Sequence, residues 1–303
     1  KIGALSRFMY DRAMPEDFLS FICDAFGITR DDLVVGGRYL NLQDLAKLPN
    51  PKGKELEQKI PTPMRVPYLD EKGSVFRAVK KKDIMLHFPY QSFDYLIRFL
   101  MEAAFDPKVD EIKITQYRVA ENSAVINTLV SAAQNGKKVT VFVELKARFD
   151  EENNMSTAER MEKAGIRIIY SIPGLKVHAK VAVIIRKDSE DGNKRRDFAY
   201  LSTGNFNEKT ARIYSDMALL TCNDEIITDI NKVFAVLEGK MSEPTFRHLL
   251  VARFNMVPEL TRMIHREIEH VKQGRKGRIV LKMNGLHDQN MINELYHASE
   301  NGV

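Results

Sequence analysis

A histidine and a lysine, His178 and Lys180, stand at the start of an apolar run rich in β-branched residues. Residues two apart project from the same face of a strand, so we expect the imidazole and the ammonium to point together. Histidine can act as a nucleophile toward phosphorus, and a fixed cation neutralises the charge that develops on the phosphoryl oxygens. The pair therefore predicts phosphoryl transfer through a covalent histidine.

A polar loop at residues 202–212 adds groups suited to the same chemistry. It contains two amides, Asn205 and Asn207, beside Gly204. Glycine lets the backbone approach a ligand closely, and a side-chain amide donates to a phosphate oxygen. A histidine beside an apolar strand is more often a structural residue, but an inward-pointing lysine is costly unless it meets an anion. The loop and Lys180 together favour a functional His178.

The composition is that of an ordinary globular protein: 44% of the 303 residues are hydrophobic and the formal net charge is +5. This charge fits either a solvated surface or an anionic ligand such as phosphate, nucleotide or nucleic acid. Cys23 and Cys222 form no CxxC motif, which argues against a disulfide framework or zinc site and fits a reducing cytoplasm. No apolar run approaches the ~20 residues of a membrane helix, and no signal peptide is visible. Because the chain starts at Lys1 and stops just after a helix end, we expect both ends to be cut.

Helical and extended patterns alternate along the chain, after a linker rich in proline and lysine at residues 49–63. We expect helices at residues 15–22, 41–46, 93–100, 123–134, 157–164 and 224–237, and strands at residues 111–117, 138–145, 166–170, 177–185, 197–201 and 215–221. A turn at 191–193 joins two of the strands. The alternation predicts an α/β sandwich with a largely parallel sheet.

An internal repeat relates residues 126–136 to residues 292–302. In both segments, a short helical pattern ends at the dipeptide Asn-Gly, and a strand-like segment precedes it, at 112–117 and 278–283. The residues are common ones, so chance agreement is one interpretation. The other is two copies of one α/β unit, with the second copy truncated at Val303.

Long motifs resemble the polyphosphate kinases of the phospholipase D-like superfamily. They are LKVHAK at 175–180, GNFNEKTAR at 204–212, KITQYRVA at 113–120, NGKKV at 135–139 and VELKARFDE at 143–151. The resemblance covers essentially the whole chain. It implies a phospholipase D-like α/β sandwich at residues 63–243, part of a head domain before it at 1–62, and a truncated second copy at 244–303.

The resemblance also implies a reaction and the residues that carry it. The reaction is reversible transfer of the ATP γ-phosphate to inorganic polyphosphate through a phosphohistidine at His178. Lys180 and Asn205 match the lysine and asparagine of the superfamily's half-motif. Tyr214 falls at the nucleotide-contacting tyrosine of the family, with an ordinary core aromatic as the alternative.

Two arginines, Arg118 and Arg148, fall where the family has a magnesium and phosphate site. Each follows an expected strand end, where ligands gather in α/β sheets. A guanidinium cannot ligate a cation, so we interpret both as phosphate clamps that lie beside Mg²⁺ through shared oxygens. The alternative is surface ion pairing with the acidic run at 150–152. The implied cofactor is Mg²⁺, with ATP and ADP as substrate and product.

The implied partners are ATP and inorganic polyphosphate, with no nucleic acid, in a cytoplasmic homo-oligomer; membrane association stays undetermined. Some positions depart from the superfamily pattern. Ile185 stands where the wider superfamily has an aspartate, as in the polyphosphate kinase branch. His287 and His297 have no matching lysine context, so we expect surface residues there, and we expect the second histidine beyond Val303.

Two other functions remain open from the residues. A phosphodiesterase or nuclease of the same superfamily would use the same histidine with water as the acceptor. The 207–212 extension and the missing aspartate argue against it. A non-catalytic module that binds polyanions would use the basic surface alone, but simple binding does not require the pairing of His178 with Lys180.

Overall fold

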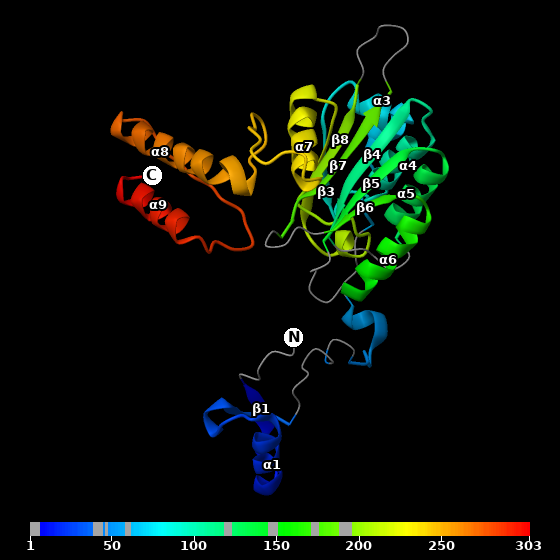
Figure 1. The fold of residues 1–303 in the computed structure, drawn as a ribbon. Coiled ribbons are helices and arrows are strands. Elements are labelled where there is room, and N and C mark those ends of the chain that lie inside the picture. Colours follow the sequence, from blue (N-terminus) through cyan, green and yellow to red (C-terminus); the bar gives the residue numbers. More distant parts are fainter. Residues whose placement is uncertain are drawn as a thin grey trace. The chain divides into compact units, whose positions relative to one another are not determined.

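The computed structural model describes residues 7–38, 45, 48–57, 62–117, 123–144, 151–170, 176–187 and 196–303, with the backbone alone for 151–154. The chain forms two compact units, Lys1–Ile60 and Pro61–Val303 (Figure 1). The second unit holds His178, Lys180, Asn205 and Tyr214. Among the described residues, no helix is both long and apolar enough to cross a membrane.

A twisted sheet is the centre of the second unit (Figure 1). Its seven strands, in spatial order, are β3 (Ile84–Phe88), β9 (Asp216–Thr221), β8 (Phe198–Ser202), β7 (Lys180–Arg186), β4 (Val109–Gln116), β5 (Lys138–Val143) and β6 (Arg167–Tyr170). β4, β5 and β6 run parallel, whereas the four remaining adjacent pairs are antiparallel. The expectation of a largely parallel sheet is therefore wrong. β7, β8 and β9 follow one another without an intervening α-helix in the described residues, and such strands pair antiparallel.

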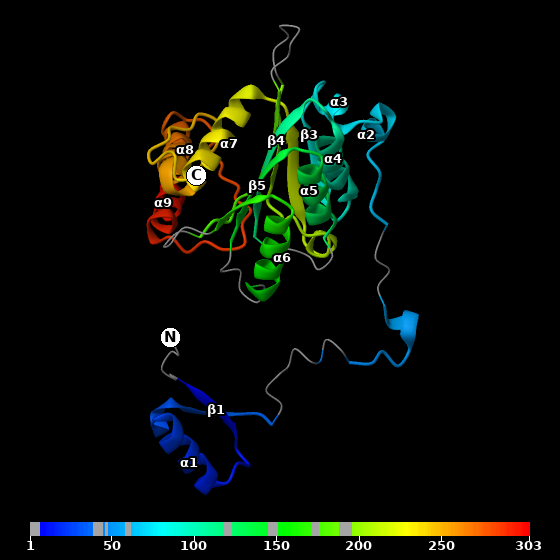
Figure 2. The same cartoon turned by 45° about the vertical axis from the view of Figure 1, so that its right-hand side comes forward.

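Helices cover both faces of this sheet, so the expected α/β sandwich is confirmed (Figure 2). One face packs against α2 (Pro67–Lys72), α3 (Val75–Val79), α4 (Asp94–Phe105), α5 (Ala124–Gln134) and α6 (Glu151–Lys163). The other face packs against α7 (Asp224–Leu237), through Ile227, Ile230 and Phe234. Residues of β7 alternate between the two faces, with Ala182 and Ile184 on the first and Val181 and Val183 on the second.

Local signals explain why the helices start and stop where they do. Ser123 accepts a hydrogen bond from the Ile126 amide at the start of α5, and Asn223 caps α7 in the same way. At the end of α5, Gly136 takes φ 78°, a left-handed conformation that glycine adopts readily. The expected helix at 224–237 is confirmed in full. β3, which was not predicted from the sequence, is a short edge strand in which alternate residues are buried.

Residues 252–303 form η5 (Ala252–Met256), α8 (Val257–Lys272) and α9 (Gln289–Glu300). α9 ends like α5: Gly302 has φ 87°, and the Val303 amide donates to the Ala298 carbonyl at 3.1 Å. The corresponding bond after α5 joins the Lys137 amide to the Ala132 carbonyl at 3.0 Å. α7 and α8 end with the same type of bond, so this common helix end does not test the repeat. The expected strand at 278–283 is wrong, because this segment has no ladder partner within the described chain.

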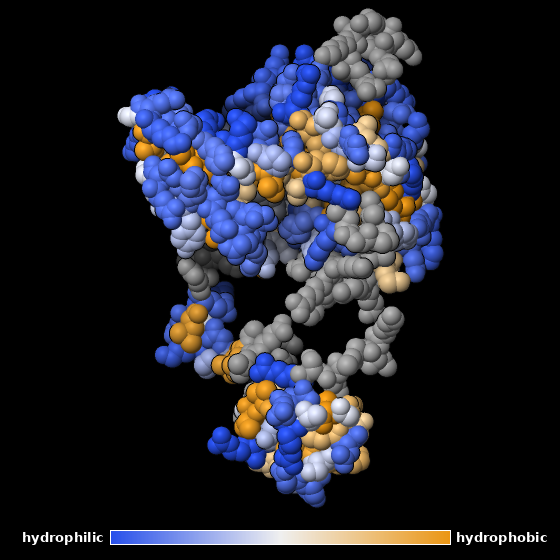
Figure 3. Space-filling model, turned by 60° about the vertical axis from the view of Figure 1, so that its left-hand side comes forward, coloured by the Kyte–Doolittle hydropathy of each residue, from blue (hydrophilic) through white to orange (hydrophobic). Residues whose placement is uncertain are grey.

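The first unit contains a parallel pair of strands, β1 (Phe8–Asp11) and β2 (Leu33–Gly36), connected through α1 (Glu16–Phe26). Two 3₁₀ turns, η1 (Arg30–Asp32) and η3 (Gly53–Leu56), complete its described elements. α1 begins after Pro15, which confirms the helix expected from residue 15. Apolar side chains lie on the surface of this unit (Figure 3). Most of the helix expected at 41–46 lies outside the described residues.

Candidate functional site

His178 and Lys180 lie together at the point where β7 begins. β7 starts at Lys180, so the expected strand at 177–185 begins later than predicted and His178 lies just before it. The imidazole is exposed, whereas Lys180 is 5% exposed. The Lys180 ammonium donates to the His178 carbonyl oxygen at 2.6 Å. Their proximity is therefore secured through the backbone of His178 and does not depend on a shared strand face.

The backbone on either side of His178 is fixed by two buried side chains, one just after β5 and one in β4. Glu144, which directly follows β5, accepts a hydrogen bond from the Val177 amide at 3.1 Å. Thr115 of β4 donates to the Ala179 carbonyl at 2.8 Å and accepts from the Val181 amide at 3.1 Å. These contacts position an exposed imidazole on a rigid segment. The sequence reading missed both residues; a carboxylate just after a buried strand is the signal that marks Glu144.

Tyr117 brings the imidazole and two cations to one aromatic ring. Its ring centroid lies 5.0 Å from that of His178, at an interplanar angle of 79°. The ammonium groups of Lys176 and Lys180 lie 5.6 Å and 5.1 Å from the Tyr117 centroid. Cations over an aromatic face are attracted by its negative quadrupole. This arrangement concentrates positive charge beside a nucleophile and suits an anionic substrate.

The loop that carries Asn205 starts opposite Lys180, because Lys180 pairs with Ser202 in the β7–β8 ladder. The Ser202 hydroxyl accepts from the Gly204 amide at 2.9 Å. A Cβ at Gly204 would lie 2.5 Å from the Asp216 carboxylate, so the close approach of this loop to β9 requires glycine. The strand pairing therefore places Asn205 near the start of β7.

Glu208 ties the same loop to the first turn of α5. One carboxylate oxygen accepts from the Ser123 hydroxyl at 3.0 Å and from the Val125 amide at 3.1 Å. Phe206 is buried, with its ring 5.3 Å from Tyr200, and anchors the loop in the core. The conformation of the Asn205 segment is therefore set before any ligand arrives.

Several buried polar atoms in this part of the protein have no hydrogen-bond partner within the described residues. Both side-chain polar atoms of Gln116 are buried and have no hydrogen-bond partner within the described residues, and the same holds for Asn205 Oδ1 and the second carboxylate oxygen of Glu208. The β4–β7 register, in which Ile114 opposes Ala182, extends to place Gln116 beside Lys180. A buried polar group without a partner costs about 1–3 kcal/mol, which favours binding of a polar group here.

The other predicted residues are placed differently. Tyr214 is 57% exposed after η4 (Thr210–Arg212), so the alternative of a core aromatic is wrong. His287 and His297 are exposed, as expected. Arg118 and Arg148 lie outside the described residues.

An apolar cavity of about 480 Å³ opens beside His178 on the face that α7 covers. Its walls come from β7, α7 and the segment 246–256. Asp229 of α7 holds that segment, because one of its carboxylate oxygens accepts from the amides of Arg247, His248 and Leu249 at 2.7–3.1 Å. Burial raises the pKa of Asp229, but these amides and the Lys232 ammonium outweigh that effect and hold the pKa below its ordinary value.

The arrangement is that of an α/β domain which presents an exposed imidazole, a buried lysine and a fixed amide loop at one end of its sheet. Two family models match the chain: Polyphosphate kinase C-terminal domain 1 at residues 74–243 and Polyphosphate kinase C-terminal domain 2 at 249–303. The chain therefore belongs to the polyphosphate kinase family.

Individual relatives agree with this assignment. The chain is 43% identical over 298 residues to a polyphosphate kinase of Vibrio vulnificus, and 42% identical over 300 residues to that of Escherichia coli K12. These alignments cover 98% of this chain and 42% and 43% of the relatives. The crystal structure of polyphosphate kinase from Porphyromonas gingivalis matches with a TM-score of 0.86 and 51% identity, over 98% of this chain and 45% of that one. The chain thus spans less than half the length of the relatives it matches.

Proposed function

We propose that this chain carries the phosphohistidine centre of a reversible phosphotransfer between ATP and inorganic polyphosphate. The observation that carries the proposal is the exposed imidazole of His178 on a rigid segment, beside the 5% exposed ammonium of Lys180. Burying an ammonium is costly unless it serves an anion or a defined acceptor. Membership of the polyphosphate kinase family supports the same reaction.

The reaction proceeds in two displacements. A ring nitrogen of His178 attacks the γ-phosphorus of ATP, the bond from that phosphorus to the bridging oxygen breaks, and ADP leaves with the bridging oxygen. A terminal oxygen of polyphosphate then attacks the phosphohistidine, which lengthens the polymer by one phosphate and restores the imidazole. The first step exchanges a P–O bond for a P–N bond and the second reverses that exchange. Overall, one phosphoanhydride bond is broken and another is formed, so the reaction runs in either direction.

The surrounding residues have distinct roles in this proposal. Lys180 neutralises the equatorial oxygens as charge develops on them, and Asn205 donates its amide to one of them. Tyr214 offers an exposed aromatic ring on which a nucleotide base stacks. Arg118 and Arg148 act as bidentate phosphate clamps.

Mg²⁺ fits this site as an ion carried by the phosphates. Mg²⁺ keeps several waters and binds proteins through one or two carboxylates together with substrate phosphates. Within the described residues, no group of three histidine, cysteine or acidic side chains could hold a metal ion. The ammonium groups of Lys176 and Lys180, which lie over the Tyr117 ring, are suited to bind phosphate. When bound, the ion neutralises phosphate charge.

We also infer the domain organisation, oligomeric state and cellular compartment of the whole protein. We assign residues 1–62 to a head domain, 63–243 to the first catalytic domain and 244–303 to the start of a second. We expect a homo-oligomer in the cytoplasm that works without nucleic acid. Both cysteines, Cys23 and Cys222, are free thiols, which fits a reducing compartment.

The test uses the full-length protein with γ-labelled ATP and Mg²⁺. The proposal predicts protein-bound label that is lost in acid and stable in base, together with acid-insoluble polymer. Release of the label as free phosphate, or hydrolysis of nucleic acid, would instead identify a phosphodiesterase or nuclease. A protein that binds polyphosphate but takes up no label would be a binding module.

A further inference from the structure

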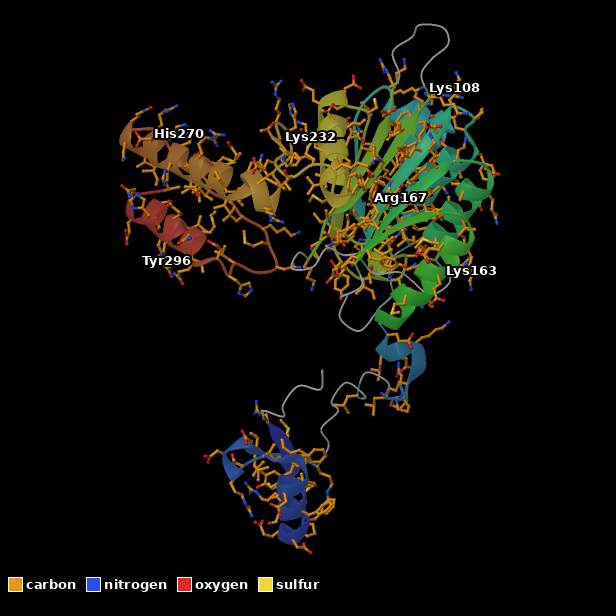
Figure 4. All side chains as sticks on the ribbon, in the orientation of Figure 1. Lys108, Lys163, Arg167, Lys232, His270 and Tyr296 are labelled. Carbon is orange, nitrogen blue, oxygen red and sulfur yellow. The ribbon has the colours of Figure 1, made fainter. Side chains whose placement is uncertain are left out.

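A second concentration of positive charge lies at the opposite end of the sheet from His178. We call it the distal basic surface, and its members are Lys80, Lys108, Lys137, Arg186, Lys187 and Arg196. β7 runs from Lys180 to Arg186, so about 20 Å of extended strand separates the two ends. Figure 4 shows Lys108 at this end of the sheet.

Backbone contacts bring these residues together from separate segments. The Lys187 amide donates to the Lys108 carbonyl at 2.8 Å, which joins the end of β7 to the start of β4. The Arg196 guanidinium donates to the Lys80 carbonyl at 3.4 Å, which joins the start of β8 to the end of α3. The surface is therefore a product of the tertiary fold and is held in place by it.

Within the described residues, the cations of this surface outnumber the acids that lie beside them. Asp106 pairs with Arg186 at 3.3 Å, and the Lys137 ammonium donates to the Asp106 and Val109 carbonyls at 2.6 and 3.0 Å. Other described acids nearby already have partners: Asp110 pairs with Lys138, Asp83 accepts from Thr221, the buried Asp197 accepts from the Arg186 amide, and Glu102 accepts from the start of α3.

Three exposed lysines of the surface, Lys80, Lys108 and Lys187, have no ion pair to a carboxylate within the residues described. Burial and then repulsion from Arg186 lower the pKa of Lys80, as expected for a cation among cations. Like charges held close together repel one another, and a bound anion relieves that repulsion.

We propose that the distal basic surface is a second, non-catalytic binding site for inorganic polyphosphate, which holds the polymer away from His178 during successive transfers. This inference rests on the proposed function for the identity of the polymer. An extended polyanion gains affinity from each cation that it meets, because its condensed counterions are released. A surface well removed from the nucleophile therefore increases the affinity for long chains and leaves the affinity for short chains unchanged.

Polyphosphate fits this surface better than nucleic acid does. Proteins that bind single-stranded nucleic acid combine a basic groove with aromatic faces on which bases stack. Phe198 is buried at this end of the sheet, and Lys82 already covers the Tyr68 ring at 4.1 Å from its centroid. Phe105, next to Asp106, is 65% exposed, but stacking successive bases along a strand needs several such faces. Four of the six cations are lysines, which act as point charges and do not read bases.

The experiment compares two triple charge reversals in the full chain. The test variant carries Lys80→Glu, Lys108→Glu and Lys187→Glu. The control variant makes the same charge change at exposed lysines elsewhere, with Lys163→Glu, Lys276→Glu and Lys282→Glu. Fluorescence anisotropy then measures the affinity for long-chain polyphosphate and for tripolyphosphate over a range of salt concentrations.

We expect the test variant to bind long-chain polyphosphate at least about tenfold more weakly than the control. The slope of log affinity against log salt should become shallower by about 2, as for the loss of three phosphate contacts to a single-stranded polyanion. Its affinity for tripolyphosphate and its labelling from ATP should match those of the control. If the test variant does not fold, a variant with the corresponding three Lys→Gln changes replaces it. That variant should show a smaller loss of affinity for long-chain polyphosphate.

Equal affinity of the two variants for long-chain polyphosphate would overturn the inference. A loss that is equally large for tripolyphosphate would also overturn it, because the surface would then not be separate from the catalytic site. If single-stranded DNA binds the parent as tightly as polyphosphate does, and the test variant loses that binding, the surface is a nucleic-acid site. If the parent protein itself binds no polyphosphate, the proposed function fails instead.

Discussion

Replacing Lys180 by methionine removes one charge from the site and leaves an apolar side chain of similar length. The change deletes the hydrogen bond from the ammonium to the His178 carbonyl, which spans 2.6 Å. It also removes a cation from the Tyr117 ring, whose centroid lies 5.1 Å away. We expect a large effect on the rate of phosphotransfer and a small effect on the free energy of unfolding.

The two magnitudes follow from the burial of this residue. A hydrogen bond from a charged group contributes about 1.5–3 kcal/mol to stability, but taking an ammonium out of water costs several kcal/mol. Because Lys180 is only 5% exposed, these opposing contributions are of similar size, and the free energy of unfolding should change by no more than about 1 kcal/mol. Loss of one preorganised group at a developing charge slows a reaction by about 10²–10³-fold.

Rapid-quench labelling with γ-labelled ATP measures the rate at which the phosphoenzyme forms, and urea denaturation measures the free energy of unfolding. The matched control is Lys163→Met, an exposed lysine at the end of α6. It should label at the parent rate. A folded Lys180→Met protein that labels as fast as this control would refute the assigned role, and so would a loss of labelling explained by unfolding.

Three further changes test the framework around the site. Asp229→Ala leaves three backbone amides without an acceptor and should lower the free energy of unfolding by about 3 kcal/mol or more, measured in urea; an unchanged value would contradict the anchoring role. Because the pKa of Asp229 is lowered in the folded protein, its carboxylate stabilises the fold fully above the ordinary pKa of 3.8 and progressively less as the pH falls, so Asp229→Asn should flatten the acid limb of the stability profile. Glu208→Ala should cost about 1 kcal/mol in thermal unfolding, because the first turn of α5 loses its acceptor. The hydrogen bond from Arg65 is the main reason that the pKa of Asp70 is lowered to about 2, so an NMR titration that places it near 3.8 would contradict that contact.

The elements around the site were predictable where their signals are local. Ser123 and Asn223 cap helices through bonds to amides within three residues, and Gly136 ends a helix through its own backbone conformation. Such features can be read from a few consecutive residues. Strand direction cannot be read in this way, because it depends on which strands become neighbours, and the order β8–β7–β4 was therefore not anticipated.

The site itself was predictable in its residues but not in its geometry. The two-residue spacing correctly brought His178 and Lys180 together, yet β7 starts only at Lys180, and the lysine contacts the histidine backbone. Glu144 and Thr115 act on His178 from other strands, which no sequence spacing reveals. The unused polar atoms of Gln116 became visible only once its burial was known.

The central claim is that His178 is the residue that becomes phosphorylated. The most direct measurement is to label the full-length protein with γ-labelled ATP, digest it under alkaline conditions, and locate the phosphoryl group by mass spectrometry. The parent should carry it on His178, and a folded His178→Gln protein should carry none and make no polymer. Phosphorylation of another residue in the parent, or persistent acid-labile label in His178→Gln, would contradict the claim.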